Sequence, residues 1–276
     1  MTHIIKKILI VGGDNRQIYL SEALNNRGFE AKIHTDGDLV AELKNTDAVI
    51  LPMPFTKDGV TVNSQNNPVE IKDLLNGLTE NNTVFVGLAG NSSVDFNNNL
   101  KVYDYSKREE LAIKNAVPTA EGVIKIAIER MNTTVFSSKV LITGFGKTAK
   151  AVAKAFYSLG ADVTICARKA SDLAYAESLC YETVNFTDLN ERCNNYDILI
   201  NTVPSIVITE TTLMTLPQSC LLIEIASAPY GIDFSAARDA GFESVVSGSL
   251  PGKIAPKTAG YIICEAICNI MKEENL

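Results

Sequence analysis

The sequence has no apolar run close to the roughly 18 residues that a membrane-spanning helix requires. A membrane-spanning segment is therefore not expected, and Met1–Lys7 is too short and too polar for a signal peptide. Basic residues are in the minority, because 25 lysines and arginines stand against 32 aspartates and glutamates, a net charge of −7. That balance argues against nucleic acid and anionic membrane surfaces as partners. We expect a cytoplasmic protein that holds any small anionic ligand through a local group of cations.

Cysteine and histidine are too few and too scattered to predict a metal site. The six cysteines include no C-x-x-C pair, and the two histidines, His3 and His34, both lie near the start of the chain. Cys264 and Cys268 are one helical turn apart, which is an ordinary core spacing and a poor disulfide geometry. We therefore expect reduced structural thiols and no bound metal.

One stretch of the chain carries a clear motif. A short apolar strand at 139–143 leads into Gly-x-Gly-x-x-Ala, and a helical pattern and a second apolar run at 162–167 follow. This strand, glycine turn and helix are typical of a dinucleotide-binding unit. Gly144 permits the tight turn, Gly146 lets a pyrophosphate approach the backbone, and Ala149 lets the helix pack close to the sheet. The predicted phosphate-binding residues are Gly144, Phe145, Gly146, Lys147 and Thr148.

The end of the second strand indicates which dinucleotide is bound. An acid there would hydrogen-bond the ribose 2′-hydroxyl of NAD, but the chain reads Arg168-Lys169-Ala-Ser171, with no acid before Asp172. A 2′-phosphate is a dianion that would attract the Arg168 guanidinium, with Lys169 and the Ser171 hydroxyl nearby. The sequence therefore favours NADP over NAD.

The nucleotide half is expected to span residues 137–257 as a Rossmann domain. Its apolar strand at 196–201 ends in Asn201-Thr202-Val203-Pro204, where the nicotinamide ribose commonly meets such a sheet. We predict that these four residues contact the cofactor, because Asn201 and Thr202 can hydrogen-bond through their side chains. Further strands are expected at 221–227 and 244–247.

With 276 residues, 46% of them apolar, the chain is long enough for about two domains. Residues 1–118 are expected to form a first α/β domain, with strands near 7–11, 30–34, 48–51, 83–87 and 102–105. Its Gly12-Gly13-Asp14 turn lacks the dinucleotide spacing, and Asp14 would repel a pyrophosphate. Strand ends in open parallel sheets line ligand crevices, so Arg16, Asn91 and Ser92 are candidates for substrate binding.

Two segments are expected to connect the halves. A helix at 119–136 would begin with Thr119 as N-cap and Glu121 in its first turn, and its positive end could face a substrate carboxylate. The segment Gly248–Gly260, dense in glycine, proline and lysine, is predicted to be a stiff loop whose Lys253 and Lys257 suit an anionic substrate. The closing helix within 258–276 is expected to pack on the first domain, although its apolar face could instead form an interface with a second copy or another partner. The predicted fold class is α/β, with two doubly wound parallel-sheet domains, of which the second is a Rossmann dinucleotide-binding domain.

Taken in order, the motifs of the chain resemble those of one known family, the dehydrogenase-like A subunits of dipicolinate synthase from spore-forming bacteria. The motifs are Gly12-Gly13-Asp14-x-Arg16-Gln17, Pro118-Thr119-x-Glu121-Gly122, Gly144-x-Gly146-x-Thr148, Asn201-Thr-x-Pro-Ser205 and Leu250-Pro-Gly-x-x-Ala-Pro-Lys-Thr-Ala-Gly260. The last of them is specific, whereas the dinucleotide fingerprint is shared by many folds. The resemblance implies NADP-dependent oxidation of a dihydro- or hydroxytetrahydro-dipicolinate, diverted from lysine biosynthesis, to aromatic dipicolinate. It also implies that the partner is a flavoprotein-like B subunit and that the setting is the cytoplasm of the sporulating mother cell.

Aromatising such a ring moves a hydride to the nicotinamide and a proton to a base, and it needs cations for two carboxylates but no metal. Arg16, Lys253 and Lys257 can supply the charge, while Thr119, Asn91 and Ser92 can hydrogen-bond. Lys257 or Glu121 could take the proton if the site perturbs its pKa.

Three other functions are weighed against this one. A 2-hydroxy-acid dehydrogenase would use a histidine paired with a carboxylate, and neither histidine lies in the nucleotide half. A shikimate-dehydrogenase-like or methylenetetrahydrofolate-dehydrogenase-like enzyme would use a lysine and stays open, as does a non-catalytic, regulatory NADP-binding protein. The sequence also leaves open whether the substrate ring is hydroxylated or dehydrated, and the oligomeric state.

Overall fold

The computed structural model describes residues 5–88, 94–96 and 99–276. The chain divides into two compact units: Met1–Asn115 together with Pro251–Leu276 form unit 1, and Ala116–Leu250 form unit 2. Two of the predicted substrate-binding residues, Asn91 and Ser92, lie outside the described residues. Among the helices that are described, none is both long and apolar enough to cross a membrane. All six cysteines are free thiols, as expected.

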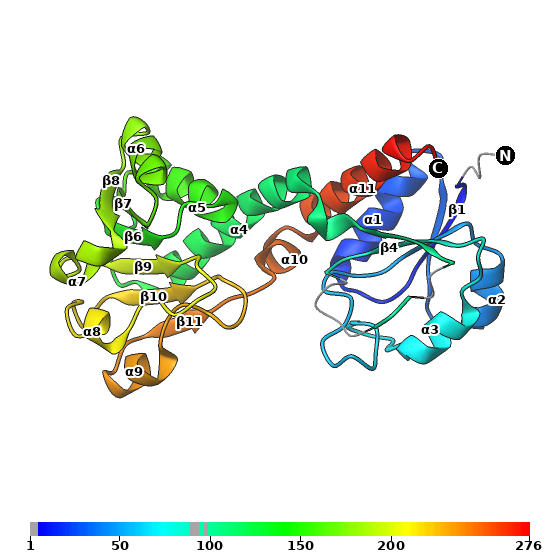
Figure 1. Ribbon diagram of the computed structural model, residues 1–276, viewed down its shortest axis with the longest axis horizontal. Coiled ribbons are helices and arrows are strands. Elements are labelled where there is room, and N and C mark those ends of the chain that lie inside the picture. Colours follow the sequence, from blue (N-terminus) through cyan, green and yellow to red (C-terminus); the bar gives the residue numbers. More distant parts are fainter. Residues whose placement is uncertain (1–4, 89–93, 97–98) are drawn as a thin grey trace. The chain divides into compact units, whose positions relative to one another are not determined.

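Unit 1 is built on a five-stranded parallel sheet in the order β2-β1-β3-β4-β5 (Figure 1). The strands are β1 (Lys7–Ile10), β2 (Glu30–Ile33), β3 (Ala48–Ile50), β4 (Thr83–Val86) and β5 (Lys101–Asp104). Its helices are α1 (Asn15–Asn25), α2 (Leu39–Lys44), α3 (Ile71–Gly77) and α11 (Pro256–Glu273), with a 3-10 turn, η2 (Tyr105–Lys107). The three central strands are apolar at nearly every position, as expected for a parallel sheet covered on both faces.

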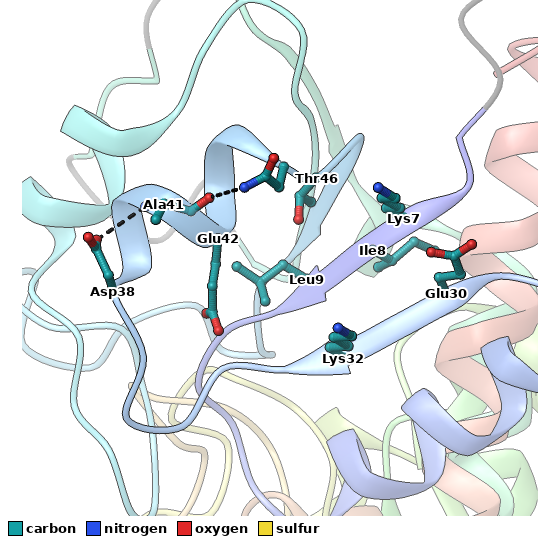
Figure 2. Close-up of a pocket in the computed structure, with 10 residues that line it drawn as sticks. Lys7, Ile8, Leu9, Glu30, Lys32, Asp38, Ala41, Glu42 and Thr46 are labelled. Carbon is teal, nitrogen blue, oxygen red and sulfur yellow. Dashed lines mark hydrogen bonds between the residues drawn. The ribbon is translucent and has the colours of Figure 1, made fainter.

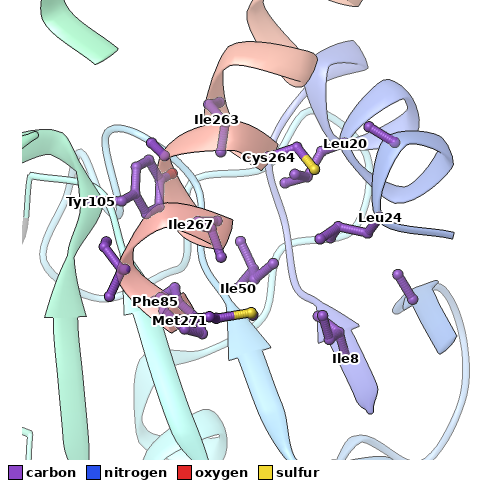
Figure 3. Packing of buried hydrophobic residues seen from close by; sticks show 14 of the residues in the cluster. Ile8, Leu20, Leu24, Ile50, Phe85, Tyr105, Ile263, Cys264, Ile267 and Met271 are labelled. Atoms are coloured by element: carbon purple, nitrogen blue, oxygen red, sulfur yellow. The ribbon is translucent and has the colours of Figure 1, made fainter. Parts of the chain in front are cut away.

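Alternate residues of these strands point to opposite faces of the sheet. Ile8 and Ile50 point to the face that α1 and α11 cover, where Leu20, Ile263 and Ile267 complete a buried cluster (Figure 3). The neighbouring strand residues, such as Leu9 and Val49, contribute to a second buried cluster, beneath α2 and α3. The C-terminal helix is therefore part of the core of unit 1.

Helix α11 packs unusually close to α1 because Gly260 lies at their contact. A Cβ atom on Gly260 would lie 2.5 Å from the carbonyl oxygen of Arg16 and 3.0 Å from the backbone nitrogen of Leu20. Those distances are shorter than van der Waals contact, so any side chain at this position would push the two helices apart. The close approach fixes α11 beside the first turns of α1.

Unit 2 is built on a six-stranded parallel sheet in the order β11-β10-β9-β6-β7-β8. The strands are β6 (Lys139–Thr143), β7 (Asp162–Ala167), β8 (Glu182–Asn185), β9 (Ile198–Asn201), β10 (Leu221–Glu224) and β11 (Ser244–Val246). The helices that follow these strands are α5 (Lys147–Ser158), α6 (Ala170–Ser178), α7 (Leu189–Arg192), α8 (Glu210–Leu213) and α9 (Phe234–Asp239), with η3 (Phe186–Asp188). In chain order the strands lie 6-5-4-1-2-3, which is the Rossmann arrangement.

Helices cover both faces of this sheet. Leu141, Leu199 and Leu222 point to the face where Leu213 of α8 and Ala237 of α9 are buried. Helix α5 follows β6 on the opposite side of the sheet from α8 and α9 (Figure 1). The predicted fold class, α/β with two doubly wound parallel-sheet domains, is confirmed.

The predicted start of a helix at Thr119 is wrong. Helix α4 runs unbroken from Glu109 to Arg130, with Pro118 in its interior. A proline removes one backbone N–H but breaks a helix only if nothing else holds it. Here Leu111, Ala116, Ala120, Val123 and Ala127 are buried at roughly helical spacing on both sides of the proline. Burial of this continuous apolar stripe stabilises the helix by more than Pro118 destabilises it, so α4 continues through the proline.

The predicted stiff loop at Gly248–Gly260 is also wrong in part. Residues Leu250–Ile254 form a short helix, α10, and α11 already begins at Pro256. Proline at the first position of a helix is favourable, because its fixed φ suits the first turn and its missing N–H has no partner there in any case. Lys253 and Lys257 therefore lie on helices.

Candidate functional site

The strand order of unit 2 reverses between β6 and β9, and ligands of open parallel sheets bind outside the carboxyl ends of strands at such a point. Gly144 follows β6 there, with a φ of +88° that favours glycine. A Cβ on Gly144 would lie 2.6 Å from the Thr202 hydroxyl oxygen and 3.0 Å from a methyl group of Val203. The turn therefore needs glycine for two separate reasons, and it lies against the residues that follow β9.

Gly146 has a different role. It is the N-cap of α5 with a φ of −78°, and a Cβ built on it would meet no atom within 4 Å. Neither the backbone conformation nor contact with other protein atoms therefore requires glycine at position 146. The start of α5 has no side-chain cap and no acid in its first turn, so its N–H groups and positive dipole end suit a phosphate. A pyrophosphate fits this turn, with the open space at Gly146 as its place of approach.

The other predicted residues of the turn differ in exposure. Lys147 is exposed, Thr148 is half-buried at the start of α5, and Phe145 is buried. The Lys150 ammonium lies 5.1 Å from the centre of the Phe145 ring and 4.8 Å from that of Tyr175 on α6. This cluster was not predicted from the sequence. Because the Phe145 side chain is packed in it, Phe145 can meet a phosphate only through its backbone.

Arg168, Lys169 and Ser171 are exposed where β7 ends, next to the strand that carries the glycine turn. Lys169 is the N-cap of α6. In the part of the chain that the structure describes, neither Arg168 nor Lys169 forms an ion pair or a side-chain hydrogen bond. Two cations therefore stand uncompensated beside the predicted position of a cofactor ribose.

The amide of Asn201, predicted to contact the cofactor, is bonded within the protein. Asn201 is fully buried, and its Nδ2 donates to both carboxylate oxygens of Glu224, at 2.7 and 2.9 Å, and to the carbonyl oxygen of Val203 at 2.9 Å. Its Oδ1 accepts hydrogen bonds from the Thr143 hydroxyl at 2.5 Å and from the backbone N–H of Val203 at 3.1 Å. These contacts leave the side chain to orient the end of β9, a different role from the predicted one.

The three residues after Asn201 line the same edge. Thr202 is half-buried and its hydroxyl donates to the carbonyl oxygen of Thr143 at 2.7 Å, while Val203 is half-buried and Pro204 is exposed. Glu224 was not among the predicted site residues. Its signal in the sequence was an acid at the end of the apolar run Leu221-Leu-Ile-Glu224.

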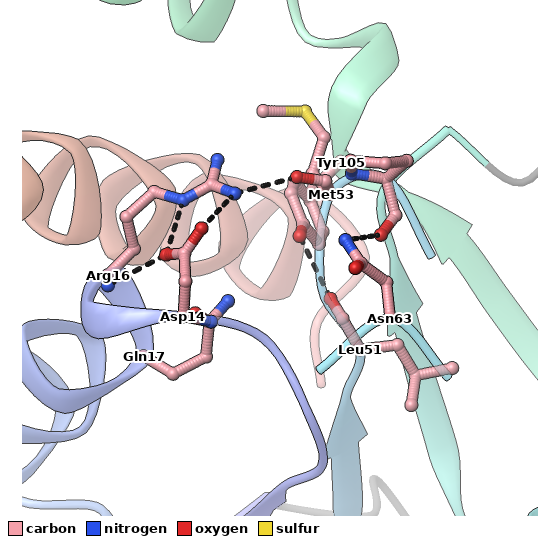
Figure 4. Close-up of polar contacts among 8 residues, drawn as sticks. Asp14, Arg16, Gln17, Leu51, Met53, Asn63 and Tyr105 are labelled. Carbon is pink, nitrogen blue, oxygen red and sulfur yellow. Dashed lines mark hydrogen bonds and ion pairs between the residues drawn. The ribbon is translucent and has the colours of Figure 1, made fainter. Parts of the chain in front are cut away.

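In unit 1, the predicted substrate-binding residue Arg16 is buried and forms an ion pair with the partly buried Asp14 (Figure 4). Its Nε donates to Oδ1 and its Nη2 to Oδ2 of Asp14, both at 2.8 Å, and Nη2 also donates to the carbonyl oxygen of Met53. Asp14 is the N-cap of α1, in a capping box with Gln17. Burial raises the pKa of the Asp14 carboxyl, but the hydrogen bonds from Arg16 outweigh it and hold that pKa below its ordinary value.

The predicted lysines lie on the surface of unit 1. Lys253 is exposed on α10, and the Nζ of Lys257 lies 4.0 Å from a carboxylate oxygen of Glu22, with its side chain 60% exposed. Lys257 also lies over the rings of Tyr19 and Tyr261. Gly252, which directly precedes Lys253, lies close to the Arg16 guanidinium, since a Cβ on Gly252 would be 3.0 Å from the Arg16 Nε. The start of α10 is thus brought to the Asp14–Arg16 pair.

The remaining predicted catalytic residues, Thr119 and Glu121, lie inside α4. Glu121 is exposed and Thr119 is half-buried. Neither is at a helix start, so the predicted interaction of a positive helix end with a substrate carboxylate does not arise there.

A pocket of about 420 Å³ opens beside β1, β2 and α2 in unit 1 (Figure 2). It is lined by Lys7 and Glu30, the first residues of their strands, and by Lys32 and Glu42. The pocket therefore extends to the amino ends of the strands, away from the edge where α/β sheets bind ligands. Its mixed charges also do not match a dianion, and we do not assign the function to it.

Comparison with known families gives two matches. Residues 7–106 match the family described as the N-terminal domain of the dipicolinate synthase A subunit. Residues 125–240 match the family described as shikimate / quinate 5-dehydrogenase. Over 97% of its length the chain is 30% identical to the dipicolinate synthase A subunit of Bacillus subtilis (strain 168), and it covers 96% of that protein.

Solved structures show the same relationship. The crystal structure of the dipicolinate synthase A subunit from Bacillus halodurans is similar with a TM-score of 0.85 and 26% identity, covering 96% of this chain and 97% of that one. The Bacillus subtilis structure has a TM-score of 0.84 and 29% identity, over 99% and 97% of the two chains. A transhydrogenase from Sinorhizobium meliloti shares the fold, with a TM-score of 0.66 at 13% identity over 97% and 93% of the chains.

Proposed function

The chain belongs to the family of dipicolinate synthase A subunits, and on that premise we propose that it oxidises a dihydrodipicolinate ring to dipicolinate with NADP as hydride acceptor. The dihydro ring would come from a hydroxytetrahydrodipicolinate of the lysine pathway by loss of water. The family and the dehydrogenase-like fold support the coarser statement that the protein is an oxidoreductase acting in dipicolinate synthesis.

One observation carries the cofactor part of the proposal. At the strand-order reversal of unit 2, α5 begins without a side-chain cap at a glycine whose missing Cβ leaves open space. Helix starts of this kind bind phosphate through backbone N–H groups. Gly144, Phe145, Gly146, Lys147 and Thr148 would hold the pyrophosphate. Thr202 and Val203, which lie against Gly144, would border the nicotinamide half together with Pro204.

The choice of NADP rests on Arg168, Lys169 and Ser171. A 2′-phosphate carries about two negative charges, and the two cations have no partner among the described residues. No carboxylate stands in this segment to accept a hydrogen bond from an unmodified 2′-hydroxyl. A charge-assisted hydrogen bond from Arg168 would therefore favour NADP.

The reaction removes a hydride and a proton from the ring. The nicotinamide supplies the hydride acceptor when it is bound. We propose that Lys253 and Lys257 hold the two ring carboxylates and that Lys257 or Glu121 accepts the proton, with Thr119, Asn91 and Ser92 as hydrogen-bond donors to the substrate. Arg16 would contribute with the part of its guanidinium that Asp14 and Met53 do not occupy.

We further propose that the partner is a flavoprotein-like B subunit, since the relative is named as an A subunit, and that the setting is the mother-cell cytoplasm. A second candidate function is that of a shikimate-dehydrogenase-like or methylenetetrahydrofolate-dehydrogenase-like oxidoreductase. One specific observation favours it, the match of residues 125–240 to the family described as shikimate / quinate 5-dehydrogenase. A third possibility is a regulatory NADP-binding protein whose partner carries out the chemistry.

The test is an assay of the purified chain with NADP and enzymatically generated dihydrodipicolinate. The proposal predicts that NADPH absorbance grows without the B subunit, and that no NADPH forms with shikimate. If NADPH forms only in the presence of the B subunit, the result supports the regulatory alternative. If NADPH forms with shikimate, the result supports the second function. Lys257→Met should lower the rate at least about tenfold, an effect of about 1.4 kcal/mol, with NADP affinity unchanged. The matched control is Lys272→Met, an exposed lysine near the end of the same helix.

A further inference from the structure

Three neighbouring strands of unit 2 end in polar residues that form one buried row. Thr143 ends β6, Asn201 ends β9 and Glu224 ends β10, and the sheet register pairs Thr143 with Asn201 and Asn201 with Glu224. All three residues are fully buried, at the end of otherwise apolar strands. The Thr143 hydroxyl donates to Asn201, and the Asn201 amide donates to Glu224. The row crosses the strand-order reversal, where β6 and β9 lie side by side.

Glu224 is the charged member of the row, and no cation balances it. Among the described residues, no lysine, arginine or histidine forms an ion pair with Glu224. Its carboxylate instead accepts hydrogen bonds from the Asn201 amide and from the backbone N–H groups of Ala226, at 2.9 Å, Gly231, at 2.8 Å, and Ile232, at 3.1 Å. A buried carboxylate is strongly unfavourable unless donors of this kind surround it. The arrangement thus ties one side chain to three separate backbone positions.

These hydrogen bonds hold two loops together. The loop from Ile225 to Ile232 folds back so that Gly231 lies on Asn201, where a Cβ on Gly231 would be 2.4 Å from Nδ2. The Gly231 carbonyl in turn accepts hydrogen bonds from Val207 and Ile208, at 2.9 Å each, in the loop that follows β9. Both loops leave the carboxyl edge of the sheet, and the second begins with Thr202 against Gly144.

From this arrangement we infer that Glu224 is a positioning residue for the nicotinamide half of the cofactor site. The inference rests on the proposed function of unit 2 as a dinucleotide domain. Glu224 acts through Asn201 and through the backbone at 226–232, and it sets where Thr202 and Val203 lie relative to the glycine turn. Only a carboxylate offers acceptors on both oxygens. A glutamine has almost the same size, but its amide NH₂ would replace one carboxylate oxygen and would face N–H donors, so that hydrogen bonds to that position would be lost.

In the proposed function, the adenosine half of the cofactor would lie beside Arg168 at the end of β7, away from Glu224. Binding of the two halves can therefore be measured separately. The experiment compares wild-type protein with Glu224→Gln and measures dissociation constants for NADP and for adenosine 2′,5′-bisphosphate, a probe of the adenosine half alone. The expected result is that the variant binds NADP about tenfold more weakly and the bisphosphate within about twofold of wild type. Glu182→Gln, an exposed glutamate at the amino end of β8, is the control and should change neither constant.

Each other outcome overturns the inference. An unchanged NADP constant in Glu224→Gln means that the carboxylate does not position the site, and an equal loss for both ligands means a general disruption of the unit. If Glu224→Gln does not fold, Thr143→Val, which removes only the hydrogen bond to Asn201, must weaken NADP selectively or the inference is wrong. Wild-type protein that binds neither ligand contradicts the proposed function itself, which is a distinguishable failure.

Discussion

The Arg16 guanidinium and the Asp14 carboxylate form two parallel hydrogen bonds, Nε to Oδ1 and Nη2 to Oδ2, each 2.8 Å long. The Arg16 side chain is only 5% exposed and the Asp14 side chain 22%. Asp14 also caps α1, and Arg16 also holds the carbonyl oxygen of Met53. The pair therefore joins the end of β1, the start of α1 and the segment after β3.

Replacing Arg16 by methionine should destabilise the protein by about 3 kcal/mol, because the partly buried Asp14 carboxylate would lose its charged partner. The measurement is the urea midpoint of unfolding at neutral pH. The double variant Asp14→Asn with Arg16→Met should regain part of the loss, since no unpaired charge remains. Equal midpoints for wild type and Arg16→Met would show that the pair does not stabilise the fold.

The same pair predicts a pH dependence. Because the folded-state pKa of Asp14 is lowered, its contribution to the free energy of unfolding is present above the unfolded pKa near ~4. That contribution is lost as the pH falls through the lower folded-state pKa. The stability difference between wild type and Asp14→Asn should therefore be constant from about pH 5 to 7 and shrink at lower pH. A difference that grows on acidification would reverse the sign assigned here.

The strands and the glycine turn could be predicted because their signals are local. The strand at 139–143, the turn Gly144–Ala149 and the run at 162–167 lie within one stretch of sequence, and the structure has β6, α5 and β7 there. Apolar runs likewise predicted the strands of unit 1. The family and the fold class followed from the order of the motifs and are confirmed.

Most of the wrong predictions concern residues whose structure depends on contacts that the local sequence does not show. Pro118 signals a helix boundary locally, but the apolar stripe on both sides of it keeps α4 continuous. The Asn201 amide appeared free for a ribose because its partner Glu224 lies 23 residues further along the chain. Arg16 is a different case, because its partner Asp14 is only two residues away, but the sequence alone does not show that Asp14 caps α1 with its carboxylate turned toward the guanidinium. Composition and spacing do not contain such pairings.

The two glycines of the fingerprint should respond differently to substitution. Gly144→Val places a side chain at positive φ against Thr202, so it should destabilise unit 2 by roughly 2 kcal/mol or more. A Cβ built on Gly146 meets no protein atom within 4 Å, so the thermal midpoint of Gly146→Val should stay within a few degrees of wild type while its NADP affinity falls at least about tenfold. Gly248→Val, also in open space, is the control for Gly146→Val and should retain NADP binding. Normal NADP binding by Gly146→Val would place the pyrophosphate elsewhere.

The most direct test of the account is a calorimetric titration of NADP and NAD into wild-type protein and into the double variant Arg168→Gln with Lys169→Gln. Charge-assisted hydrogen bonds contribute about 1.5–3 kcal/mol, so the double variant should bind NADP about ten- to a hundredfold more weakly and NAD nearly as before. Lys154→Gln, an exposed lysine on α5, should leave both affinities unchanged. Wild-type protein that binds NAD as tightly as NADP, or a double variant that keeps full NADP affinity, would contradict the account.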